Sequence, residues 1–83
     1  MMYEHLDGTK FWFKENSFIL HREYGPAIER SNGDKAWYLN GELHRIDGPA
    51  IEYSNGDKRY YLNNEIINSE GEFLRKIRLK AFW

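Results

Sequence analysis

Residues 20–42 read LHREYGPAIERSNGDKAWYLNGE, and residues 43–65 follow directly as LHRIDGPAIEYSNGDKRYYLNNE. The second stretch is a near copy of the first, with a period of 23 residues. A fixed period of this size is typical of stacked supersecondary units, in which each unit buries its apolar side against its neighbour. The sequence therefore predicts a repeat architecture, with repeat one at 20–42 and repeat two at 43–65.

Turn residues inside each repeat indicate β-structure. Asn32-Gly33 and Asn55-Gly56 occupy equivalent places, and Asn-Gly favours a two-residue type I′ turn between antiparallel strands. Asn40-Gly41 gives the same signal, and Asn63-Asn64 is its weaker copy. We expect strands near residues 10–14, 18–22, 26–30, 35–39, 42–45, 49–53, 58–62 and 65–67.

Both ends of the array depart from the repeat. Residues 7–19 match only the second half of a unit, and we interpret them as a degenerate half-repeat that caps the stack. After the repeats, Ser69 and Glu72 have the spacing of a helix capping box. Apolar residues then recur at helical spacing, namely Phe73, Leu74, Ile77 and Ala81. This pattern predicts a capping helix over about 70–81 that covers the open end of the last hairpin.

The expected fold is thus a single domain over residues 1–83, mainly β. It is a meander of antiparallel hairpins closed by a short C-terminal α-helix. The chain has 83 residues, 41% of them hydrophobic and 17% aromatic, and large rings supply much buried area in so small a domain. No cysteine is present, which excludes disulfides and thiolate metal sites. No apolar run approaches the roughly 20 residues of a membrane span, so we expect a soluble, cytoplasmic protein.

The formal net charge of −1 argues against a general nucleic-acid binder, which would carry a basic surface. The charge is nevertheless uneven, since residues 73–83 hold four cations, Arg75, Lys76, Arg78 and Lys80, and no acid. A nucleic-acid-binding accessory protein that uses this basic helix is therefore one alternative function.

The predicted register assigns side chains to two faces of the sheet. A two-residue turn at Asn32-Gly33 would place Ile28 opposite Trp37, and side chains alternate between faces along a strand. The expected core face then carries Trp12, Ile28, Trp37, Leu39, Ile51, Tyr60 and Leu62. The other face carries an aromatic ladder beside two small alanines, which is either a second packed layer or a protein interface. Because aromatic residues and arginine dominate interface hot spots, the predicted protein-binding residues are Phe13, Tyr38, Tyr61, Arg59, Arg75 and Arg78.

His21 and His44 stand at equivalent positions one repeat apart. A metal site would need a well-spaced third ligand, and a small hydrolase using His21 or His44 would need a carboxylate beside it. The sequence favours a structural role, in which each histidine forms a hydrogen bond with the next hairpin. We therefore predict no catalytic residue, no metal and no cofactor, and keep the hydrolase as a second alternative.

The order of an aromatic strand, Asn-Gly, Leu-His-Arg, Asp-Gly-Pro-Ala and Asn-Gly-Asp-Lys resembles the repeat of small proteins from tailed phages and large DNA viruses. It also resembles a divergent MORN repeat, which has the same period, an aromatic strand and an Asn/Asp-Gly turn. The glycine that follows histidine in MORN units is replaced here by Arg22 and Arg45. The resemblance covers residues 7–66. It implies a MORN-like hairpin array with a scaffolding or dimerising role and supplies no catalytic residue.

The sequence and this resemblance together predict a non-enzymatic protein-binding module. The viral resemblance implies a phage-encoded inhibitor or adaptor that acts on a host or defence protein in the host cytoplasm. The expected partner is a protein, a homo-oligomer stays open, and nucleic acid is disfavoured by the charge.

Overall fold

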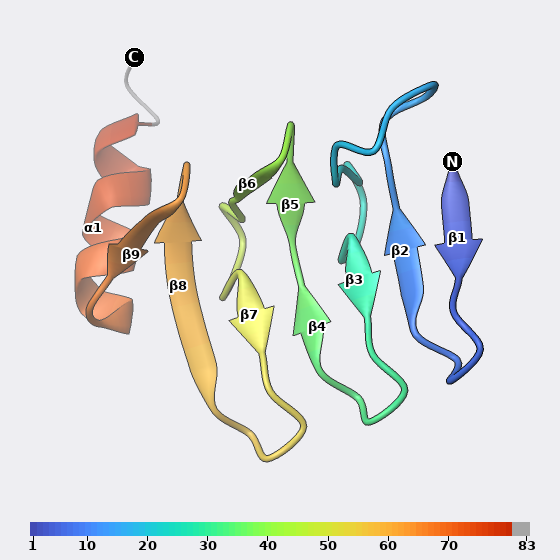
Figure 1. The fold of residues 1–83 in the computed structure, drawn as a ribbon. Helices are drawn as coiled ribbons and strands as arrows, with labels where there is room; N and C mark the ends of the chain where they lie inside the picture. Colours follow the sequence, from blue (N-terminus) through green and yellow to red (C-terminus); the bar gives the residue numbers. More distant parts are fainter. Residues whose placement is uncertain (81–83) are drawn as a thin grey trace.

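The computed structural model describes residues 1–80 as a seven-stranded antiparallel sheet and a small two-stranded hairpin, with a helix at one end (Figure 1). Its elements are β1 (Met2–Glu4), β2 (Lys10–Trp12), β3 (Ile28–Glu29), β4 (Lys35–Ala36), β5 (Tyr38–Leu39), β6 (Glu42–Leu43), β7 (Ile51–Glu52), β8 (Lys58–Leu62), β9 (Glu65–Ile67) and α1 (Glu70–Lys80). The main sheet has the order β1-β2-β3-β4-β7-β8-β9, and β5 and β6 form a small hairpin. The predicted fold class, a mainly β meander with a C-terminal helix, is confirmed.

The strand formed by β4 and β5 changes its neighbour at Trp37. The Trp37 N–H donates to the Ala50 carbonyl at 2.7 Å, whereas the Trp37 carbonyl accepts from the His44 N–H at 3.1 Å. The lower half of this strand therefore pairs with β7 and its upper half with β6. The Arg45 N–H still donates to the Tyr61 carbonyl at 3.4 Å, so the chain leaves the sheet after Arg45 and returns to it at Ala50. Residues 46–49, which hold the Gly-Pro part of the repeat motif, form the loop between β6 and β7.

The turns at Asn32-Gly33 and Asn55-Gly56 are not type I′. The Arg30 N–H donates to the Asp34 carbonyl at 2.9 Å, and the Gly33 N–H donates to the Arg30 carbonyl at 3.0 Å, which encloses a three-residue loop. Gly33 has φ of 100° and Gly56 has φ of 96°, while neither asparagine before them has positive φ. This is a type I turn followed by a left-handed glycine.

Type I′ geometry occurs instead in the turns at the other ends of the strands. Asn40 and Gly41 have φ of 53° and 82°, and Leu39 pairs with Glu42 across them. The second repeat has the same two-residue turn at Asn63-Asn64, with φ of 50° and 68°.

The longer loop shifts the predicted register. Ile28 pairs with Ala36 and not with Trp37, and Ile51 pairs with Arg59 and not with Tyr60. Because a shift of one residue moves a side chain to the other face, the predicted face was wrong for Ile28 and Ile51, although Ile28 is buried as predicted, with 7% of its surface exposed. These two residues lie with Tyr38, on the face opposite Trp37.

The two faces of the sheet differ in character. One, which we call the open face, carries an almost wholly apolar row across six strands: Tyr3, Phe11, Ile28, Ala36, Ile51 and Arg59. The other, which we call the covered face, carries Trp12, Trp37 and Tyr60. It also carries a row of charges that alternate in sign from strand to strand: Glu4, Lys10, Glu29, Lys35, Glu52 and Lys58. Opposite charges directly across a strand pair stabilise that pairing.

The hydrophobic core lies where α1 meets the last two strands on the covered face. Phe73 is 2% exposed and packs with Leu62 and Ile67, against Tyr60 and Ile77. The Ser69 Oγ accepts from the Glu72 N–H at 3.2 Å, which confirms Ser69 as the N-cap.

Some predicted boundaries were wrong. Leu74 does not belong to the buried stripe of α1, because it is 54% exposed, and Ala81 lies outside the described residues. The expected strand over 18–22 is reduced to a single bridge between Leu20 and Phe13. Strand β1 was not predicted, because residues 2–4 carry no turn signal before them.

Candidate functional site

An arginine of the repeat motif is held between an indole ring and a glycine. The Arg45 guanidinium lies 3.8 Å from the centroid of the Trp37 ring. Its Nη1 donates to the Pro49 carbonyl at 3.0 Å and to Glu52 Oε2 at 2.9 Å, and its Nε donates to Asp47 Oδ1 at 2.8 Å. Arg45 therefore fastens the protruding loop to the covered face of the sheet.

The first repeat has the same arrangement, with Arg22 at 3.9 Å from the Trp12 ring and Nη1 bonded to Glu29. A Cβ built on Gly48 would lie 2.9 Å from the Cζ of Arg45, and one on Gly25 would lie 3.0 Å from the Cζ of Arg22. A side chain at either glycine would therefore displace the guanidinium that packs against the backbone there. The repeated Arg-x-x-Gly-Pro motif is explained as a structural clasp, without a ligand.

Gly48→Ala should lower the free energy of unfolding by about 1–2 kcal/mol, because Arg45 must move away from Trp37 and Glu52. Thermal unfolding followed by circular dichroism measures this loss. Gly71→Ala is the matched control: a Cβ there meets nothing within 4 Å, and alanine favours the helix. A Gly48→Ala variant as stable as the unmodified chain would disprove the clasp.

The two repeat histidines act as acceptors for the backbone of the next turn. His21 Nδ1 accepts from the Asn40 N–H at 2.9 Å, and His44 Nδ1 accepts from the Asn63 N–H at 3.0 Å. The predicted hydrogen bond from each histidine to the next hairpin is confirmed. In residues 1–80 no three His, Asp or Glu side chains gather in a group that could hold a metal ion.

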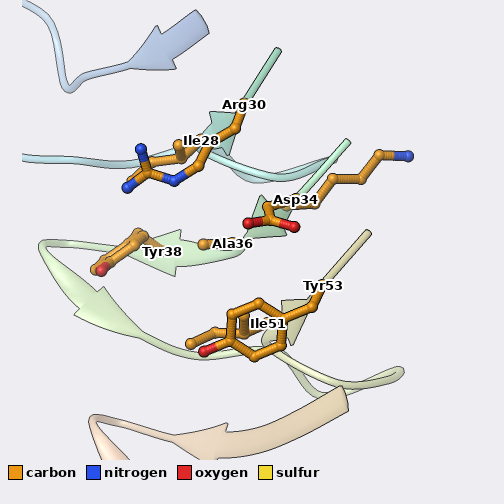
Figure 2. Close-up of a pocket in the computed structure, with 8 residues that line it drawn as sticks. Ile28, Arg30, Asp34, Ala36, Tyr38, Ile51 and Tyr53 are labelled. Atoms are coloured by element: carbon orange, nitrogen blue, oxygen red, sulfur yellow. The ribbon is translucent and has the colours of Figure 1, made fainter. Parts of the chain in front are cut away.

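The centre of the open face is slightly hollowed. Figure 2 shows Arg30, Tyr38 and Tyr53 around a floor made of small and branched apolar side chains, namely Ile28, Ala36 and Ile51. The hollow has a volume of about 150 Å³. Small-molecule sites usually enclose roughly 300–1,000 Å³, so this hollow fits a single side chain of a partner better than a metabolite.

The carboxylate at the rim of this hollow is already engaged. Asp34 Oδ1 accepts from the backbone N–H of Ser54 at 2.6 Å, in the neighbouring turn. This backbone hydrogen bond lowers the pKa of Asp34 below its ordinary value. Asp34 therefore ties two adjacent turns together in its charged form and does not serve as a proton donor near neutral pH.

The sequence-predicted site residues fall into two groups. Phe13, Tyr38 and Tyr61 are half-buried, as Trp37 is, and they lie on the open face with the exposed Arg59. Arg59 extends toward the Tyr53 ring, at 5.7 Å from its centroid.

The other two predicted residues are separate from this face. Arg75 and Arg78 lie on α1 and are exposed, and Arg75 is 3.6 Å from Glu72. Lys76 of the same helix lies 3.7 Å from Glu65. The structure brings four of the six predicted residues onto one face and leaves two on the helix, where acidic neighbours offset part of the positive charge.

Sequence reasoning missed an aromatic cluster at the β1 end of the open face. Ring centroids lie 6.3 Å apart between Tyr3 and Phe11, 6.3 Å between Phe11 and Phe13, and 6.1 Å between Phe13 and Phe18. Phe18 is 89% exposed and Tyr3 is 53% exposed. Together with the first two methionines, these rings line an apolar hollow of about 430 Å³, formed by Met1, Met2, Tyr3, Phe13 and Phe18. The alternation of Phe11 and Phe13 with Trp12 was the available signal.

Comparison with known proteins gives no relative for this chain. No family model, no curated protein and no solved structure matches it. Its described part contains no helix with the length and apolarity needed to cross a membrane.

Proposed function

We propose that this chain is a non-enzymatic protein-binding module whose contact surface is the open face of the sheet. The observation that carries the proposal is the aromatic cluster of Tyr3, Phe11, Phe13 and Phe18, in which Phe18 is 89% and Tyr3 53% exposed while the other two rings are half-buried. Exposed apolar groups gathered in one place are typical of interaction sites, whereas single exposed apolar residues are ordinary.

The contacts of the polar motif residues also favour a protein-binding function over a catalytic one. The motif residues that could have carried a reaction, His21, His44 and Asp34, each form a hydrogen bond that organises a turn. The carboxylate nearest to a repeat histidine is that of Glu23, 3.8 Å from His21 Nε2, and its side chain is 65% exposed to solvent. The apolar hollow beside Phe18 has no converging polar groups, which a substrate site would use to orient its ligand. An inhibitor or adaptor role toward a host protein, which the viral resemblance implies, is a more specific form of this proposal.

Phe18→Ser should reduce capture of a protein partner by about tenfold, because it removes the most exposed ring of the aromatic cluster. The chain, immobilised through a C-terminal tag, is incubated with cell lysate, and the retained proteins are quantified by mass spectrometry. Tyr24→Ser is the matched control, since Tyr24 is 93% exposed but lies in the loop held by Arg22. Equal recovery on both variants, or no protein above background, would contradict the proposed surface.

A further inference from the structure

Strand β1 is an edge strand with unused hydrogen-bonding groups. The Phe13 N–H donates to the Met1 carbonyl at 2.8 Å, and the His5 N–H donates to the Thr9 carbonyl at 2.7 Å. In an antiparallel ladder, the residues that bond to a neighbour alternate with those that point away from it. Met1, Tyr3 and His5 therefore face β2, whereas the N–H and C=O groups of Met2 and Glu4 point outward from the sheet.

The other outer strand of the sheet, β9, differs from β1 because a helix lies beside it. Figure 1 shows α1 beside β9, and Lys76 Nζ lies 3.7 Å from Glu65 Oε1 across that contact. A copy that added head-to-tail from β1 to the β9 edge would therefore have to fit beside α1, whereas nothing in the described residues lies beside the outer edge of β1. Pairing of β1 with β1 of a second copy is isologous and closes after two chains.

We propose that the β1 edge pairs antiparallel with the β1 edge of a second copy, so that Tyr3 lies opposite Tyr3 of that copy. This inference rests on the proposed protein-binding function and adds a second contact, made by the backbone at the edge of the sheet beside the open face. In this register Met2 of each chain bonds with Glu4 of the other, and all four outward backbone groups of each chain are used. The two Tyr3 residues form the intervening pair without hydrogen bonds, where side chains come closest.

Two features favour this register over the two registers shifted by two residues: the charge of Glu4 and the number of paired residues. Moving one chain by two residues in one direction places Glu4 opposite Glu4, and like charges directly across a strand pair are destabilising. Moving it by two residues in the other direction leaves Met2 as the only outward residue that is paired. In the proposed register the aromatic clusters of both copies lie on the same side of one continuous sheet, joined through the Tyr3 pair.

The pairing is expected to be weak, because a contact between three-residue strands is small beside the roughly 1,200 Å² that stable interfaces bury. Cysteine cross-linking detects such contacts, and the natural chain has no cysteine to interfere. Tyr3→Cys should form an intermolecular disulfide at least about tenfold faster than Tyr24→Cys, because pairing raises the effective thiol concentration. Tyr24 is the control because it is 93% exposed and distant in the sequence from β1.

Two further variants test the register and the backbone. A mixture of Met2→Cys and Glu4→Cys chains should cross-link to each other faster than either does alone. Met2→Pro removes an outward N–H that no bond within the sheet uses, so it should keep the melting temperature and abolish self-association in sedimentation experiments. Met2→Leu, which keeps the N–H, should associate as the unmodified chain does.

Equal cross-linking rates for Tyr3→Cys and Tyr24→Cys would overturn the inference, as would self-association that Met2→Pro leaves unchanged. The proposed function has a separate outcome. If the chain stays monomeric but captures another protein in a Phe18-dependent manner, the protein-binding function stands and pairing with a second copy is wrong.

Discussion

Phe73→Ala should lower the free energy of unfolding by about 3–5 kcal/mol, enough to unfold most domains of this size. Phe73 is 2% exposed, and its ring centroid lies 4.8 Å from that of Tyr60. Removal of the Phe73 ring leaves a cavity among Leu62, Ile67 and Ile77. Thermal unfolding followed by far-ultraviolet circular dichroism measures the loss.

The matched control for this substitution is the next residue of the same helix. Leu74 is 54% exposed, so Leu74→Ala should cost less than about 1 kcal/mol. If both variants lost the same stability, the core would not lie where α1 meets β8 and β9.

Trp37→Ala should cost about 3–5 kcal/mol, although Trp37 is only half-buried. The ring is the platform on which the Arg45 guanidinium lies, at 3.8 Å from its centroid. Without it, Arg45 loses its stacking partner and the loop that carries Gly48 and Pro49 loses its attachment to the sheet. The expected loss of stability has two parts, the burial of the Trp37 ring and its cation–π contact with Arg45.

Tyr38→Ala, one residue further on and on the open face, is the comparison for Trp37→Ala. Tyr38 is also half-buried, but it borders the hollow of Figure 2 and has no arginine stacked on it in the described contacts. We expect a smaller loss of stability in chemical denaturation. A Trp37→Ala variant that unfolds at the same denaturant concentration as the unmodified chain would show that the clasp is dispensable.

The fold was predictable from the sequence where a position strongly favours a few residue types. Asn40-Gly41 lies in a type I′ turn, and Ser69 begins a helix, because few other residues satisfy those positions as well. The histidine contacts were also predictable, since His21 and His44 occur at the same offset from Asn40 and Asn63.

The register and the covering of the faces were not predictable in this way. Asn-Gly occurs in two-residue and in three-residue turns, and nothing local to Asn32-Gly33 distinguishes them, yet the choice decides which face Ile28 occupies. The clasp could not be predicted, because the sequence does not show that the Arg45 guanidinium stacks on the ring of Trp37, eight residues earlier in the chain. The candidate surface was missed in part because β1 has no repeat counterpart.

The alternating charges on the covered face bear on how a nearly duplicated sequence avoids misassembly. Repeats that resemble each other can exchange equivalent strands during folding, either within one chain or between two chains. Strands β2, β4 and β8 each place a lysine in the charged row, and β3 and β7 each place a glutamate there. A strand that pairs with its own counterpart from another repeat in the same register therefore meets a like charge, while its native neighbour offers the opposite one. The charge of one side chain per strand thus favours pairing with the adjacent strand over pairing with the equivalent strand of another repeat.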